Sequence, residues 1–269
     1  MEKPWDLKIQ RARTQVAEFN TIVVDYLATN PAGISQELLN GNEIHVKLHI
    51  HRQPPDVLAV LSGEIIHNLR SALDAVTFAL VIEKTRILGV PQKDGYENLI
   101  QFPIVVKKRS LSEYKFLKHF KKESFYADLQ EFQPYNWSKE FVSDHQRVEV
   151  NKGHHLALLS ELSNRDKHRG INFIFCALRN FMVTCPDGVS TDGKFTYSAV
   201  FKNNEKILNF NLVGNGDYSK VNVIPEFSLS YVPSEYGFKN DSVQNQISTL
   251  LNQSAYYVNQ LAFHLEKNS

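Results

Sequence analysis

The sequence predicts an α+β fold, in which a helical bundle is joined to an antiparallel β-sheet. Residues 4 to 170 and 241 to 267 carry long segments with the 3.6-residue period of amphipathic helices. Residues 171 to 233 instead show apolar and β-branched runs separated by Gly, Asn and Asp turns, as in an antiparallel meander. At 269 residues, the chain is expected to form one domain that spans residues 1 to 269.

The composition is that of an ordinary globular protein, with 42% hydrophobic and 22% charged residues. The net charge of +1 does not demand a nucleic acid or a membrane as partner. The longest apolar run, Ala75 to Ile82, is shorter than the roughly 20 residues of a spanning helix, and the first residues lack the apolar stretch of a signal peptide. Cys176 and Cys185 have an odd separation, so a disulfide between them is not expected. We expect a reduced, cytoplasmic protein that does not bind membranes.

An N-terminal helix is predicted from Pro4 to Ala28, because Pro4 suits a first helical turn and apolar residues recur at helical spacing. After a break at residues 30 to 33, residues 43 to 51 alternate as a half-buried strand that can join the sheet. Three histidines lie on its polar face, but Lys47 interrupts them and a zinc site needs about four ligands. The sequence therefore predicts no metal site there.

The central helix is predicted to begin after Asp56 and to end near Arg86. One side carries an apolar stripe, and a second stripe carries His67, Arg70 and Asp74 at spacings of three and four residues. Val60 and Phe78 lie on the line of this second stripe, so it does not resemble a solvated face. We therefore expect a His-Arg-Asp row to be buried inside the bundle.

Residues 107 to 123 are rich in lysine and interleaved with Tyr114, Phe116 and Phe120. One interpretation is an amphipathic surface helix with extended lysine side chains. The other is a nucleic-acid contact, in which the aromatic rings stack on bases. The residues that would contact a nucleic acid are Lys107, Lys108, Arg109, Lys115, Lys118, Lys121 and Lys122.

A second polar signature lies in the predicted helix from His154 to Arg169, where a leucine stripe is followed at once by hydrogen-bonding residues. Its candidates for a site are Asn164, Asp166 and His168. Such groups are costly to bury without partners, and the polar row of the central helix offers natural ones. Three interpretations stay open: a structural polar clamp between two helices, a catalytic or binding site, and unrelated surface groups.

The remaining elements follow the same reasoning. A helical piece is expected at residues 125 to 132, and a loop or lid at residues 136 to 153. Strands are predicted at residues 171 to 183, 196 to 202, 207 to 213 and 221 to 232, with glycine and asparagine at the turns. Ser242 can cap a final helix that ends near Glu266.

Three motifs, HNLRSALD at residues 67 to 74, EFQPY at 131 to 135 and ELSNRDKHR at 161 to 169, stand in this order with FPI at 102 to 104. Together they resemble a family of uncharacterised bacterial proteins, to which no activity is assigned. The sequence departs from the family's pattern at Ala75, where a histidine is usual, and at Arg165, where an apolar residue is usual.

The chain also resembles, more remotely, the helical bundles of the HEPN type. That resemblance implies a metal-independent ribonuclease, as found in bacterial defence or toxin systems, in which an Arg is paired with a His four to six residues on. Arg147 and His154 come nearest to that spacing.

Two functional hypotheses follow. The first is a binding or interaction protein, with its polar cluster fixing the helix register and an unknown partner, RNA or another protein. The second is a metal-independent ribonuclease or related phosphodiester enzyme, in which His67 or His168 transfers protons and Arg70 stabilises the phosphate. No cofactor is expected, because the chain contains no GxGxxG, P-loop, HExxH or CxxC pattern. Ser-His-Asp chemistry stays open, although no GxSxG elbow supports it. The oligomeric state also stays open, a homodimer included.

Overall fold

The computed structural model describes residues 2–90, 95–106, 111–137, 151–168, 173–197, 203–231 and 242–266. The helices among them are α1 (Pro4–Ala28), α2 (Val57–Leu88), α3 (Ser124–Glu131), α5 (His155–His168) and α6 (Val243–Glu266). The strands are β1 (Ala32–Leu39), β2 (Glu43–Ile50), β3 (Phe173–Thr184), β4 (Val189–Thr191), β5 (Thr196–Tyr197), β6 (Lys206–Gly214) and β7 (Asn222–Tyr231). Helices and antiparallel strands are both present, so the predicted α+β fold is confirmed.

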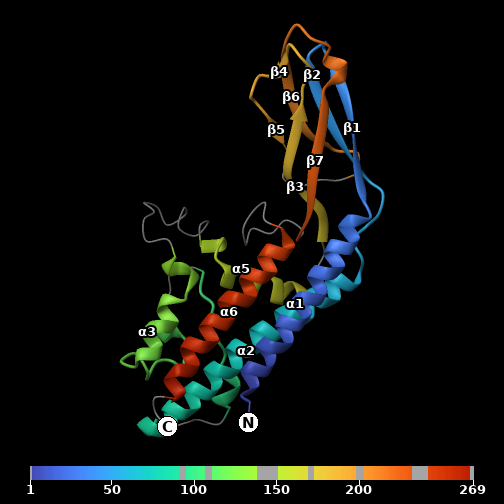
Figure 1. Cartoon of the computed structure of the whole chain (residues 1–269). Helices are drawn as coiled ribbons and strands as arrows, with labels where there is room; N and C mark the ends of the chain where they lie inside the picture. The colour runs from blue at the N-terminus through green and yellow to red at the C-terminus, as the bar shows by residue number, and fades with distance from the viewer. Residues whose placement is uncertain are drawn as a thin grey trace.

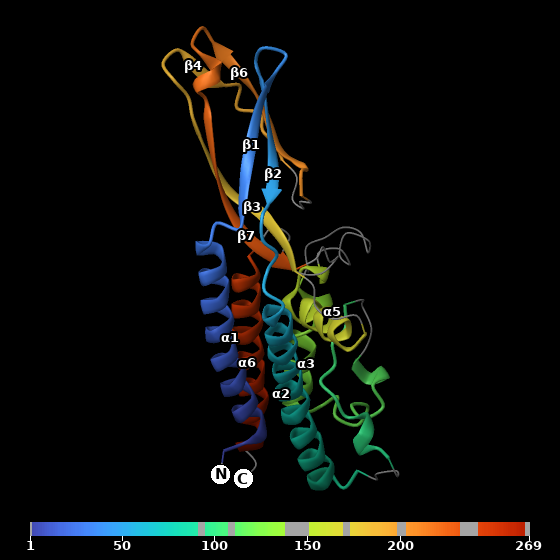
Figure 2. The same cartoon turned by 90° about the vertical axis from the view of Figure 1, so that its right-hand side faces the viewer.

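The long helices α1, α2 and α6 lie side by side and form the body of the molecule (Figures 1 and 2). Each buries one apolar stripe against the others, as the helical period predicts. Helix α5 packs on α2 and α6, and α3 packs on α6. Helix α1 begins and α6 ends at the same end of this bundle (Figure 2).

The strands form an arm that projects from the opposite end of the bundle (Figures 1 and 2). One sheet has the order β1-β2-β6-β4, with β5 also paired to β6, and β3 pairs with β7 in a second, two-stranded sheet. Ile44, Val46 and Leu48 of β2 are buried and the side chains between them are more exposed, as its alternation predicts. The side chain of Gln36 in β1 bonds the backbone of Val221 and Val223, and so links the two sheets.

The strand β1 was not predicted from the sequence. None of its residues is buried and half of them are exposed, so it lacks the apolar alternation by which strands are recognised. It pairs with β2 through a hairpin turn in which Asn40 and Gly41 have positive φ angles of 50° and 80°. The expectation of a simple meander was also wrong, because β4 and β5 both pair with β6 whereas β3 skips to β7.

Helix α2 is the one described helix that is long and apolar enough, by length and composition, to cross a membrane. Half of its most apolar window is buried inside the protein. The core helix of a soluble protein meets the same criteria, so the sequence of α2 alone does not indicate a membrane.

Candidate functional site

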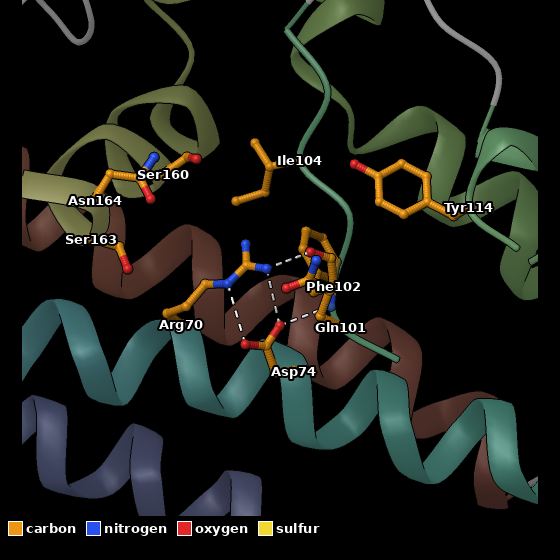
Figure 3. A pocket seen from close by; sticks show the side chains of 9 residues that line it. All are labelled: Arg70, Asp74, Gln101, Phe102, Ile104, Tyr114, Ser160, Ser163 and Asn164. Carbon is orange, nitrogen blue, oxygen red and sulfur yellow. Dashed lines mark hydrogen bonds and ion pairs between the residues drawn. The ribbon is translucent and has the colours of Figure 1, made fainter. Parts of the chain in front are cut away.

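Arg70 and Asp74 form a pair on α2 that holds the backbone of Phe102 at both of its polar groups (Figure 3). Arg70 Nε and Nη2 lie 3.3 and 3.2 Å from the Asp74 carboxylate oxygens. Nη2 also donates to the carbonyl of Phe102 at 2.7 Å, and Asp74 accepts from the N–H of Phe102 at 2.8 Å. The two side chains thus replace a missing strand partner for the extended segment that contains Phe102.

A cavity of about 240 Å³ opens beside this clamp. Its lining is mostly polar and consists of Arg70, Asp74, Gln101, Phe102, Ile104, Tyr114, Ser160, Ser163 and Asn164. The second terminal nitrogen of Arg70, Nη1, points away from Asp74 into this space (Figure 3). No described residue accepts a hydrogen bond from Nη1. The Nε and Nη2 groups of the guanidinium therefore hold the fold, and the N–H groups of Nη1 remain available to a ligand.

Segments of the motifs HNLRSALD, FPI and ELSNRDKHR meet around this cavity. HNLRSALD supplies Arg70 and Asp74, FPI supplies Phe102 and Ile104, and ELSNRDKHR supplies Ser163 and Asn164. The motif EFQPY binds the segment that contains Phe102 at its other end, at Val105. The buried side chain of Gln133 accepts from the N–H of Val105 at 2.9 Å and donates to the carbonyl of Leu129.

The structure brings some of the candidate residues named from the sequence together and leaves others apart. The α2 side chains Arg70 and Asp74 do share a cavity with Asn164 of α5. An ion pair between the two helices was also expected, and it is absent among the described residues. Arg70 takes its carboxylate from its own helix, and Glu161 of α5 is bonded to Arg165 at 2.8 Å.

The prediction that His67 is buried with Arg70 is wrong, because His67 is exposed. Its described contact is with Ser71, at 3.4 Å. The segment around Phe102 covers α2 at Asp74, about two turns from His67, and leaves the earlier part of the stripe uncovered. Val60 and Phe78, whose apolar character argued for burial, are themselves 60% and 39% exposed.

Asp166 does not reach the cavity lining and lies instead against Gly63 of α2. A Cβ at position 63 would collide with the Asp166 carboxylate, so the glycine permits α5 to approach α2 closely at this point. His168 is the last residue of α5, and its side chain lies outside the described residues. Its distance from Arg70 therefore stays a prediction.

The basic segment does not form the expected amphipathic helix. Residues 111–123 form the short turn η2 (Leu111–Glu113) followed by further turns. Lys115, Lys118, Lys121 and Lys122 are exposed, whereas Lys107, Lys108 and Arg109 lie outside the described residues. Phe116 and Phe120 are only 2% and 0% exposed, so neither ring can stack on a base. Tyr114 turns its hydroxyl toward the cavity (Figure 3).

A second cluster of ionisable groups, which was not predicted from the sequence as a cluster, lies where α5 meets α6. His154 and His155 stack at 3.9 Å between ring centroids, and His155 Nε2 lies 2.6 Å from the hydroxyl of Tyr257. Burial lowers the pKa of His154 to about 3, with a further contribution from the charge of His155, and burial lowers that of His155 to about 4. Burial also raises the pKa of Tyr257. His154 is thus a buried, neutral residue of the core. Arg147, with which the HEPN-type spacing would pair it, lies outside the described residues.

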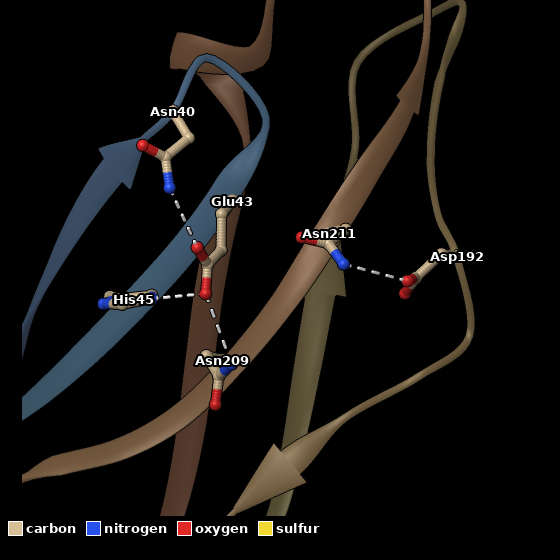
Figure 4. Close-up of polar contacts among 6 residues, drawn as sticks. All are labelled: Asn40, Glu43, His45, Asp192, Asn209 and Asn211. Carbon is tan, nitrogen blue, oxygen red and sulfur yellow. Dashed lines mark hydrogen bonds and ion pairs between the residues drawn. The ribbon is translucent and has the colours of Figure 1, made fainter.

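Polar side chains of β2 form hydrogen bonds with other residues of the projecting β-arm. Glu43 accepts hydrogen bonds from His45, Asn209 and Asn40, and Asn211 donates to Asp192 beside them (Figure 4). The bond from His45 is the main reason that the pKa of Glu43 is lowered. Within the described part of the chain, no group of three or more His, Cys, Asp or Glu side chains could hold a metal ion.

No protein-family model matches the chain, and comparisons with curated proteins and with solved structures give no match.

Proposed function

We propose that the protein is a binding protein, whose cavity between α2 and α5 receives a ring-sized group bearing a carbonyl or carboxylate oxygen and does not itself act as a catalytic site. The observation that carries this proposal is that only two of the three guanidinium nitrogens of Arg70 are bonded within the described part of the protein. Its Nε and Nη2 hold Asp74 and Phe102, while Nη1 faces the cavity. A guanidinium N–H fixed in this way is a preorganised donor for such an oxygen.

Size and chemistry both fit this class of ligand. An apolar cavity of roughly 150 Å³ holds a benzene ring, so the volume of about 240 Å³ accommodates a ring with a polar substituent. The remaining lining offers neutral hydroxyl and amide groups of Ser160, Ser163 and Asn164. Because Arg70 is already paired with Asp74, the site does not require a fully charged ligand.

The lining offers little to a catalyst. A general base needs a titratable group within hydrogen-bond reach of the substrate. No histidine lies among the described lining residues, and both carboxylate oxygens of Asp74 accept bonds from Arg70. Asp74 therefore serves the clamp, which favours binding over catalysis.

Ligand-observed NMR with benzamide and benzoate tests the proposal. Both probes present an acceptor oxygen on a ring, and they differ in charge. We expect saturable binding of at least one probe to the wild-type chain and its loss in Ser160→Leu, which fills the cavity without touching the clamp. Ser71→Leu, on the same helix as Arg70 but outside the cavity, is the matched control and should bind as wild type. Equal signals in all three proteins would contradict the proposal.

The competing proposal is a metal-independent ribonuclease. The cavity-facing guanidinium of Arg70 is the observation that favours it, because such a group can stabilise charge on a phosphate. Incubation of the purified chain with RNA in EDTA tests it. Cleavage that disappears in His168→Ala, with folding unchanged, would establish the ribonuclease and overturn the assignment of the α2–α5 cavity as non-catalytic.

A further inference from the structure

Ser124, His264 and Asp128 form a continuous chain of hydrogen bonds between α3 and α6. Ser124 Oγ lies 3.1 Å from His264 Nδ1, and His264 Nε2 lies 2.6 Å from Asp128 Oδ2. Ser124 and Asp128 are four residues apart and therefore share one face of α3. His264 reaches them from the last turn of α6, which packs against α3. This chain of hydrogen bonds joins residues that lie 140 positions apart in the sequence, so no local sequence motif predicts it.

The hydrogen-bond partners fix the proton positions for a neutral imidazole. An ionised carboxylate only accepts, so His264 Nε2 carries the hydrogen and donates it to Asp128. The other nitrogen, Nδ1, then accepts from the Ser124 hydroxyl. This is the arrangement in which an imidazole can take the proton of a serine while a carboxylate stabilises the resulting cation. The two nitrogens are exchanged relative to the chymotrypsin arrangement, but each role is filled.

The surroundings of Ser124 suit a nucleophile. Ser124 is exposed, whereas the side chains of His264 and Asp128 are only 13% and 33% exposed. Ser124 is also the first residue of α3, and the preceding residue, Glu123, does not cap the helix with its side chain. The first turn of a helix has backbone N–H groups without intrahelical acceptors. Those of Ser124 and Phe125 therefore offer donors for a developing oxyanion beside the nucleophile.

We propose that Ser124, His264 and Asp128 form a hydrolytic site for esters of small carboxylic acids. Ser124 Oγ bonds to the ester carbonyl carbon while its proton moves to His264 Nδ1. The ester C–O bond then breaks, and the departing alcohol takes that proton. Water attacks the acyl-serine and gives a proton to Nδ1, which returns it to Oγ as the carboxylic acid leaves. Ester and water thus become acid and alcohol, and no further reactant is needed.

A fluorophosphonate probe tests the nucleophile in the intact chain, because labelling forms an Oγ–P bond and releases fluoride and the serine proton. We expect mass spectrometry to find the label on Ser124 and p-nitrophenyl acetate to be hydrolysed. Ser124→Ala should abolish both while keeping the His264–Asp128 bond and the fold. His264→Gln should slow labelling roughly 100-fold, as expected for the loss of a general base.

Ser219 provides a matched control, because its hydroxyl bonds the Asp217 carboxylate at 2.6 Å without an imidazole. Ser219→Ala should leave both readouts unchanged. Labelling of Ser124 no faster than that of Ser219, or unchanged hydrolysis in Ser124→Ala, would show that His264 only clamps α3 to α6. If His264→Gln does not fold, the wild-type comparison of Ser124 with Ser219 and the Ser124→Ala result decide the question.

Discussion

Acid should destabilise this protein through the stacked pair His154 and His155. Both imidazoles are buried, and their pKa values in the folded chain, about 3 and about 4, lie below the ordinary value of 6.5. The unfolded chain therefore binds their protons first as the pH falls. The stability contributed by the neutral pair is complete above pH 6.5 and is lost progressively below it.

The magnitude follows from the same values. Each imidazole removes about 1.4 kcal/mol of unfolding free energy per pH unit between 6.5 and its own lowered pKa. At pH 5 the loss is about 2 kcal/mol for each histidine, or about 4 kcal/mol for the pair. A typical domain has only about 5 to 15 kcal/mol of stability, so this is a large fraction of the total. Acidic groups with lowered pKa values, such as Glu43, contribute at lower pH, so the window from pH 7 to 5 isolates the histidines.

Urea unfolding at several pH values between 7.5 and 5 measures this loss. His155→Phe removes one of the two protonation sites and retains an aromatic ring against Tyr257. It should reduce the slope of stability against pH by about half. His119→Gln, at an exposed position, should leave the slope unchanged. A wild-type stability that is flat between pH 7 and 5, or an equal slope in His155→Phe, would refute the reasoning.

Three further predictions concern the hydrogen bonds to the segment from Phe102 to Val105 and the close contact between α2 and α5. Asp74→Ala should lower the unfolding free energy by about 2 to 3 kcal/mol in urea titrations, because the N–H of Phe102 loses its acceptor and the Arg70 guanidinium loses its carboxylate. Gln133→Leu should cost about 1 to 3 kcal/mol by thermal unfolding, because it strands the N–H of Val105 in the core, and a neutral result would contradict that bond. Gly63→Ala should stabilise α2 by about 1 kcal/mol only when Asp166→Ala removes the collision, so a double-mutant cycle without coupling would contradict the close approach.

The helical frame could be predicted because burial imposes a period on the sequence. Helices α1, α2 and α6 and strand β2 each show that period, and each lies close to where it was expected. The strand β1 and the pairing of β3 with β7 could not be predicted in this way. An exposed strand carries little period, and pairing between distant strands has no local signature.

The candidate site likewise has parts that local spacing predicts and parts that it does not. The spacing of Arg70 and Asp74 indicates a helical pair, and the polar run of α5 indicates a second wall. The third wall is the backbone of Phe102, which has no side-chain signature of its own. His67 was misassigned because neighbours on a helical stripe share a direction, but whether they are buried depends on which segment crosses them. The hydrogen-bonded row of Ser124, His264 and Asp128 could not be predicted for a related reason, since His264 lies far from the other two in the sequence.

The most direct test of the central claim is an NMR titration of the arginine side chains, with Arg70 assigned through Arg70→Lys. On addition of benzamide or benzoate, the Nη1 signals of Arg70 should shift saturably, while its Nε signal, held by Asp74, should change little. The same titration of Ser160→Leu should show no shift. An Nη1 signal that does not respond to either probe, or that responds equally in Ser160→Leu, would mean that Arg70 serves the fold alone.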